Sequence, residues 1–360
     1  MATAPLNLEA DVVELTRAIC DIESVSGNET ELADAIQAAL SKYSHLEVIR
    51  DGDAVVARTN LGRPTRVVIA GHIDTVPVAN NLPVQMLSME REQVLYGRGT
   101  VDMKAGVAVQ LKLAATLPDS NTDVTWIFYD HEEVEATKNG LGRLARNRPD
   151  LLDASFAVLC EPTSAQVEGG CNGTMRVDLS FRGVKAHSAR PWMGKNAIHS
   201  AAEALNILAN YTPAEVDVDG LVYRESLNAV IIGGGIATNV IPDECVITVN
   251  YRFAPSKSAD DAEAHLREIF DGIELEVIDI AEGARPGLDR AEAKAFVAAT
   301  QTVARPKYGW TDVARFSALG IPAVNFGPGD PSKAHADDEA VPVNQIYACE
   351  KALRAWLSVG

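Results

Sequence analysis

The feature that most constrains the fold is an alternation of short apolar runs with helical patterns, which changes character once within the 360-residue chain. In the first part, apolar runs predict strands at 66–70, 124–129 and 155–160, and helical periodicity predicts helices at 8–20 and 104–117. Runs that are apolar throughout are typical of strands buried on both faces of a sheet. We therefore expect an α/β fold whose mixed, mostly parallel sheet is flanked by helices.

A further helix is predicted to begin near Asn28. This residue is followed three positions later by Glu31, which is the spacing of a capping box, and apolar residues then recur at helical intervals. An asparagine here would accept a hydrogen bond from the first free backbone N–H groups of the helix.

The pattern changes between about Thr174 and Arg285. The expected elements there are a strand at 175–181, a helix at 196–210, strands at 226–232 and 245–253, and a helix at 259–270. This order is typical of a small α+β sandwich. Helix, strand, helix character then returns at 291–304, 321–326 and 343–357. We expect residues 174–284 to form a domain inserted into a larger one made of 1–173 and 285–360.

Composition excludes several classes of protein. The formal net charge of −18 opposes nucleic acid and anionic membranes, and the chain has no basic stripe that would overcome it. No run approaches the roughly 18 apolar residues of a membrane helix, and the start of the chain lacks a basic leader. Five scattered cysteines without a Cys-x-x-Cys pair favour neither a disulfide framework nor a thiolate zinc site. We expect a cytoplasmic protein with a small-molecule substrate.

Acidic and imidazole side chains follow the predicted strands of the larger domain. The carboxyl ends of parallel strands meet at one edge of a sheet, where open α/β sheets place their active sites. Asp102, which comes just before the helix at 104–117, is the exception in following no predicted strand. The groups concerned are His72 and Asp74, Asp102, Glu132 and Glu133, and Glu161.

Several carboxylates around one imidazole would repel each other unless a cation balanced their charge. Carboxylate oxygen and imidazole nitrogen are ligands of divalent transition metals, zinc foremost. Two ions that share a bridging carboxylate need about five protein ligands, and therefore a second histidine. His335 is the candidate, because it lies in a Gly/Pro-rich loop after the predicted strand at 321–326.

Each of these groups alone has an ordinary explanation. Asp102 could cap the following helix, and Glu132 and Glu133 could form a solvated acidic turn. Their occurrence together and in order at strand ends favours a functional site.

Five ordered motifs resemble the co-catalytic dizinc amidohydrolases of the aminoacylase and glutamate carboxypeptidase family. They lie at 71–77, 97–106, 132–133, 161–162 and 334–335, and the resemblance covers nearly the whole chain. It implies a zinc-peptidase-like catalytic domain with an inserted, ferredoxin-like dimerisation domain. It also implies a cis peptide bond after Asp102.

The resemblance further implies roles for individual residues. Two zinc ions would be bound per subunit, with cobalt or manganese as substitutes. One ion would be held by His72 and Glu161 and the other by Glu133 and His335, with Asp102 bridging both.

The catalytic groups implied are Glu132 as general base, Asp74 orienting the His72 imidazole, and His187. His187 would reach from the inserted domain into the partner's site, so that a homodimer would be required for catalysis. For substrate binding the resemblance points to Arg252, Asn239 and Thr311. Arginine suits a planar carboxylate because its forked donors bind both oxygens.

The reaction that the resemblance implies is removal of the succinyl group from N-succinyl-LL-diaminopimelate in lysine biosynthesis, by a metal-activated water. Two alternatives stay open. The same centre could act on another N-acyl amino acid, such as acetylornithine, or on a dipeptide. The chain could also be a binding protein that keeps the metal without turnover, although such a protein would not need Glu132.

Overall fold

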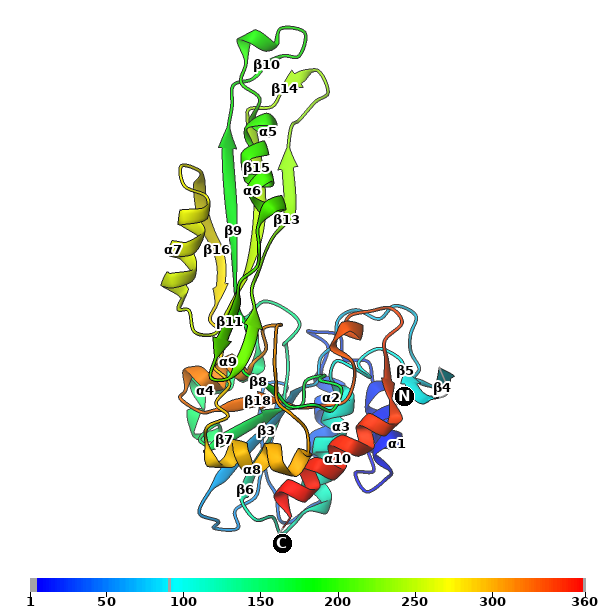
Figure 1. Ribbon diagram of the computed structural model, residues 1–360. Coiled ribbons are helices and arrows are strands. Elements are labelled where there is room, and N and C mark those ends of the chain that lie inside the picture. Colours follow the sequence, from blue (N-terminus) through cyan, green and yellow to red (C-terminus); the bar gives the residue numbers. More distant parts are fainter. Residues whose placement is uncertain (1–4, 90–91, 359–360) are drawn as a thin grey trace. The chain divides into compact units, whose positions relative to one another are not determined.

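The structure, a computed structural model, describes residues 5–89 and 92–358 (Figure 1). The chain divides into two compact units. The first unit consists of Met1–Gly169, Pro286–Arg305 and Arg315–Gly360, and the second of Gly170–Arg285 and Pro306–Ala314. The second unit therefore contains a second stretch of chain, Pro306–Ala314, which we call the return segment. The predicted insertion at 174–284 does not include it.

The first unit is built on an eight-stranded sheet in the order β1-β2-β6-β3-β7-β18-β8-β17. Its four central strands are parallel, β2 is antiparallel to both of its neighbours, and β8 is antiparallel to β18. The expectation of a mixed, mostly parallel sheet in an α/β fold is confirmed. In sheet order, the strands are Glu47–Asp51, Ala54–Arg58, Asp123–Tyr129, Arg66–His72, Phe156–Leu159, Ala323–Asn325, Glu168–Gly169 and Arg305–Pro306.

Helices pack around this sheet because its central strands are apolar on both faces. Helix α3 (Lys104–Thr116) is buried along most of its length and contacts β3, α1 and α10 (Figure 1). Val107, Leu111 and Leu113 on α3 belong to one core that also includes β3 and β6. The other α-helices are α1 (Val12–Cys20), α2 (Thr30–Leu40), α4 (Gly140–Asn147), α8 (Ala291–Thr300), α9 (Val313–Ala318) and α10 (Val343–Leu357).

The first unit also contains a small sheet and two 3-10 helices. The small sheet has the order β19-β5-β4, with β19 at Ala340–Pro342, β5 at Glu92–Tyr96 and β4 at Gln85–Met89. Two 3-10 helices, η1 (Pro149–Leu151) and η3 (Pro331–Lys333), lie in loops.

The second unit contains a four-stranded antiparallel sheet, β13-β15-β9-β16, with helices packed against it. Alternate residues of β9 and β15, such as Val177 and Val249, are buried in one core, which explains the alternating sequence pattern. Its larger elements are β9 (Gly173–Arg182), α5 (Ala197–Ser200), α6 (Ala202–Asn210), β13 (Ser226–Gly234), β15 (Glu244–Phe253), α7 (Ala259–Ile269) and β16 (Glu274–Ala281). Its smaller ones are β10 (Ala186–His187), η2 (Pro191–Met193), β11 (Glu215–Val218), β12 (Leu221–Arg224) and β14 (Val240–Ile241).

Some local predictions were wrong. Helix α2 begins at Thr30, and its cap residue is Glu29, which makes no capping hydrogen bond with its side chain. The backbone N–H of Asn28 instead donates to Val25, so Asn28 lies in a turn before the helix. Glu29 is buried and accepts the N–H of His131, a tertiary contact that a local capping pattern cannot reveal. The helix expected at 196–210 is divided into α5 and α6.

Within residues 5–89 and 92–358, no helix combines the length and the apolar character needed to span a membrane.

Candidate metal centre

The acidic and imidazole groups at the strand ends of the first unit converge. His72 is the last residue of β3, Glu161 follows β7, and Asp102 lies two residues before α3. Glu132 and Glu133 follow β6, and a loop after η3 carries His335. Three groups of side chains offer ligand atoms within 4.8 Å of one another: His72, Asp102 and Glu161; Asp102, Glu133 and His335; and His72, Glu132 and Glu133.

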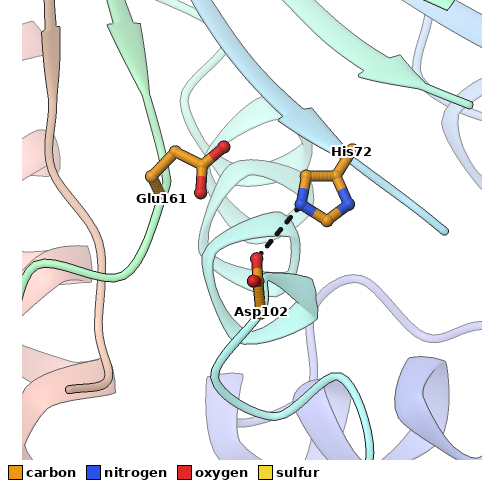
Figure 2. A group of neighbouring side chains, drawn as sticks. All are labelled: His72, Asp102 and Glu161. Atoms are coloured by element: carbon orange, nitrogen blue, oxygen red, sulfur yellow. Dashed lines mark hydrogen bonds and ion pairs between the residues drawn. The ribbon is translucent and has the colours of Figure 1, made fainter. Parts of the chain in front are cut away.

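The first of these groups is shown in Figure 2, where the two carboxylates and the imidazole face a common space. His72 is buried, and its Nε2 lies 3.2 Å from Oδ1 of Asp102. Glu161 is also buried. Two oxygens and one nitrogen are thus available from three different segments of the chain.

The second group uses the other oxygen of the same aspartate. Nε2 of His335 lies 3.4 Å from Oδ2 of Asp102 and 3.0 Å from the Glu133 carboxylate. Asp102 therefore presents Oδ1 to one histidine and Oδ2 to the other. A carboxylate in this position can be shared by two ions.

The pKa shifts indicate that positive charge is favoured at this site. Burial would lower the pKa of His72, but hydrogen bonds to Asp102 and Asp74 hold it well above the ordinary value. Hydrogen bonds to Asp102 and Glu133 raise the pKa of His335 to about 10. Both imidazoles thus lie in surroundings that favour positive charge, and this donor set of nitrogen and oxygen atoms fits a divalent metal.

Asp74 holds the loop that carries Glu132 and Glu133. Its Oδ1 accepts the N–H of Glu132 at 3.0 Å, and its Oδ2 accepts the N–H of Glu133 at 3.0 Å. A hydroxyl that the sequence did not single out, Ser26 Oγ, donates to the same Oδ2 at 2.6 Å. Burial would raise the pKa of Asp74, but the hydrogen bond from His72 and the other donors lower it to about 2.

Nδ1 of His72 lies closer to the backbone of Asp74 than to its side chain. The distance is 3.0 Å to the Asp74 carbonyl oxygen and 3.4 Å to the carboxylate Oδ1. Either acceptor would leave Nε2 free to face Asp102. The Asp102–Met103 peptide bond is cis, as the family resemblance implied.

Glu339 is a buried carboxylate near the centre that the sequence did not single out. It accepts the backbone N–H of Asp102 and pairs with Arg98, which lies inside the motif at 97–106. No sequence signal marks it, because it is the last of three consecutive acidic residues, Asp337 to Glu339, and the other two are exposed.

The remaining candidates belong to the second unit. His187 is exposed in β10, and its Nδ1 accepts the N–H of Ala189 at 3.0 Å. The carbonyl of Asn239 accepts the N–H of Ser188, so His187 and Asn239 lie near each other. Nε of Arg252, in β15, donates to Asn250 at 3.1 Å.

Thr311 is buried in the return segment Pro306–Ala314. Its carbonyl accepts a hydrogen bond from Sγ of Cys171 at 3.7 Å. Of the four candidates of this unit, the structure brings His187 and Asn239 together.

Comparison with known proteins identifies the family. Residues 68–358 match the model of Peptidase family M20/M25/M40. The chain belongs to this family. Among solved structures, a tripeptidase from Staphylococcus aureus has the same fold as this chain, with a TM-score of 0.78 at 19% identity over 98% of both chains.

Two curated relatives match over nearly their full length. A Mycobacterium tuberculosis protein named "Putative succinyl-diaminopimelate desuccinylase DapE" is 52% identical, covering 98% of this chain and 99% of its own. The succinyl-diaminopimelate desuccinylase of Corynebacterium glutamicum is 46% identical over 98% of each chain. Family membership and the clustered ligand atoms together make this chain a metal-using hydrolase of linear amides.

Proposed function

We propose that this protein is a zinc-dependent amidohydrolase that cleaves N-succinyl-LL-diaminopimelate to succinate and LL-diaminopimelate, a step of lysine biosynthesis. The observation that carries the metal chemistry is the carboxylate of Asp102, whose two oxygens face two different donor groups. The substrate is supported by the names of relatives that are 52% and 46% identical over nearly the whole chain.

Two zinc ions would be held by residues of the first unit. His72 and Glu161 would hold one ion and Glu133 and His335 the other, with Asp102 contributing to both, a division supported by the two groups of ligand atoms in which these residues lie. Bound zinc supplies Lewis-acid polarisation of a carbonyl and lowers the pKa of water toward about 7.

The residues of the chain then move the proton and orient the groups. Glu132 takes the proton of the attacking water and returns it to the leaving amine, which is supported by its position within reach of His72 and Glu133. Asp74 fixes the backbone of Glu132 and keeps Nε2 of His72 directed at Asp102.

Groups of the second unit bind the substrate. Arg252 takes a substrate carboxylate, and Asn239 and Thr311 supply further polar contacts to the substrate. His187 donates to the developing oxyanion in the partner subunit's site, a role supported by its exposed imidazole.

The homodimer would form along strand β13. In the described residues this strand lies at the edge of its sheet and pairs only with β15. Three consecutive apolar side chains on it are exposed, Val230, Ile231 and Ile232, at 53, 65 and 53%. A long apolar edge strand is a template for pairing with a second chain, so a copy of this protein is the proposed partner. The five cysteines, all in described residues, are buried and unpaired, which fits a cytoplasmic location.

The metal centre is tested by elemental analysis together with activity. We expect two zinc ions per chain, loss of succinyl-diaminopimelate hydrolysis after chelation, and recovery on addition of zinc. Full hydrolysis after complete removal of metal would contradict the proposal.

The substrate is tested separately on the zinc-loaded protein. We expect a higher kcat/KM for succinyl-diaminopimelate than for acetylornithine or a dipeptide. A preference for either competitor would change the assigned substrate and leave the metal centre unaffected.

A further inference from the structure

Two oppositely charged side chains are buried next to the proposed metal centre without belonging to its ligands. Arg98 and Glu339 are only 3% and 0% exposed, and their side chains pair at 2.8 Å between Nη1 and Oε2. Neither residue is in any of the three donor groups found among the described residues. A buried ion pair is costly to desolvate unless further hydrogen bonds satisfy both partners.

The other carboxylate oxygen of Glu339 accepts hydrogen bonds from the backbone around Asp102. Oε1 accepts the N–H of Val101 at 2.8 Å and the N–H of Asp102 at 3.1 Å. The carbonyl of Glu339 also accepts the N–H of Gly97 at 3.0 Å. One residue therefore fixes both ends of the loop that carries the shared carboxylate.

Arg98 connects that loop to two other segments. Its Nη1 donates to the carbonyl of Ala336, the residue after His335, at 3.1 Å. Its Nε donates to the carbonyl of Pro77, on the loop that follows His72 and Asp74, at 3.0 Å. Three segments that each carry a proposed zinc ligand are thus joined through one guanidinium group.

We propose that Arg98 and Glu339 are positioning residues that set the separation of Asp102 and His335, and so determine the affinity of the zinc site that these two ligands share with Glu133. The inference rests on the proposed metal centre. His335 is exposed on a loop, and we attribute the 3.4 Å separation of its Nε2 from Oδ2 of Asp102 to the anchoring of both loops by this pair. Residues that orient metal ligands typically change metal affinity by about 10–100-fold when replaced.

The substitution Glu339→Gln removes the negative charge and one acceptor oxygen of the side chain while keeping its size. A glutamine has the same shape but only one acceptor oxygen. Its NH2 group must face either the N–H donors of Val101 and Asp102 or the guanidinium of Arg98, so one set of buried donors loses its acceptor.

The matched control is Glu225→Gln in the second unit. The Glu225 side chain is also fully buried, pairs with Lys257 at 2.9 Å and accepts the N–H of Ala254 at 2.8 Å. Like Glu339, it is a buried carboxylate that pairs with a basic side chain and accepts a backbone N–H, but in the part of the chain that the structure describes it contacts no segment that carries a proposed zinc ligand.

The experiment is a zinc titration of the wild type and both variants against a competing chelator, with thermal unfolding recorded for each. We expect both variants to unfold at a lower temperature. Only Glu339→Gln should bind one of its two zinc ions about 10–100-fold more weakly. Arg98→Lys keeps the charge but loses the forked contacts, so a smaller loss of affinity for the same ion is expected.

Equal zinc affinity of the wild type and Glu339→Gln would overturn the inference, as would an equal loss in Glu225→Gln. If Glu339→Gln does not fold, Arg98→Lys with unchanged affinity for both ions would overturn it. A wild-type protein that binds no zinc would instead refute the metal centre itself.

Discussion

His72 and Asp74 in the first unit and His187 in the second are held in different ways. In the first unit, buried His72 and Asp74 are joined to the backbone of neighbouring segments by several hydrogen bonds. In the second unit, His187 is exposed, and its Nδ1 accepts a hydrogen bond from the backbone N–H of Ala189, two residues away. The first arrangement is organised within one unit. The second leaves the His187 imidazole exposed, so that it can act only when a substrate or a partner subunit contacts that surface.

This difference separates two requirements of the proposed reaction. Metal binding and proton transfer need ligands held to within a fraction of an ångström, which buried hydrogen bonds provide. Substrate binding and oxyanion stabilisation need groups that can be approached. The predictions below test whether the two requirements are divided between the units in this way.

The largest effect is expected for Glu132→Gln. The amide cannot accept the proton of the attacking water, so kcat should fall by about 10²- to 10⁴-fold. Zinc content should stay at the wild-type value, because Glu132 is proposed as a base rather than a ligand. Steady-state kinetics and elemental analysis check both results. Loss of a zinc ion would make Glu132 a ligand, and an unchanged kcat would remove it from the reaction.

A complementation experiment tests the exposed group of the second unit. His187→Ala should lower kcat by about 10²-fold or more, because it removes a donor to the oxyanion. Mixing it with Glu132→Gln should restore about one quarter of the wild-type activity, since half of the randomly formed dimers carry one complete site. Each variant remixed with itself is the control. No recovery in a mixture shown to contain heterodimers would contradict a shared site.

Arg252→Lys should chiefly affect substrate binding. A lysine ammonium cannot reproduce the forked contact with a carboxylate, so KM should rise by about 10-fold or more while zinc content is unchanged. The control is Arg176→Lys on the neighbouring strand β9, since Arg176 is exposed and pairs with Asp279. An unaltered KM for Arg252→Lys would exclude Arg252 from the substrate site.

The convergence of the metal centre was predictable because its geometry follows from strand ends. His72, Glu132 and Glu161 all come directly after or near the ends of apolar strands, and parallel strands bring such positions to one edge. The parallel core was predictable for the same reason, since continuous apolar runs such as 124–129 require burial on both faces.

Contacts that depend on tertiary structure were not predictable. The backbone N–H groups held by Asp74 and Glu339 have no sequence signature, because any residue supplies a backbone N–H. The cap expected at Asn28 failed because Glu29 is drawn into a contact with His131, far away in the sequence. The return segment Pro306–Ala314 has no composition that distinguishes it from its flanks.

The smallest effect on activity is expected at a buried carboxylate of the first unit that lies away from the metal ligands. Asp123 accepts the N–H of Leu61 at 2.7 Å and the N–H of Arg63 at 2.9 Å. Burial would raise its pKa, but these hydrogen bonds lower it below the ordinary value. Because the folded-state pKa is below the unfolded one, Asp123 stabilises the fold above about pH 4, and this contribution is lost as the pH falls through the folded-state pKa.

Asp123→Asn should therefore lower the free energy of unfolding by about 1–3 kcal/mol at pH 7, because one backbone N–H then faces an amide NH2. The deficit should shrink at pH 3, because the carboxyl of the unfolded chain takes up a proton below about pH 4 and the advantage of the charged form in the folded state then decreases. Urea unfolding at both pH values measures it, with zinc content and kcat at pH 7 as the controls. A deficit that is equal at the two pH values would mean that the charge of Asp123 is not what stabilises the loop. A changed kcat would mean that buried carboxylates of the first unit cannot be divided into those that support the fold and those that support the site.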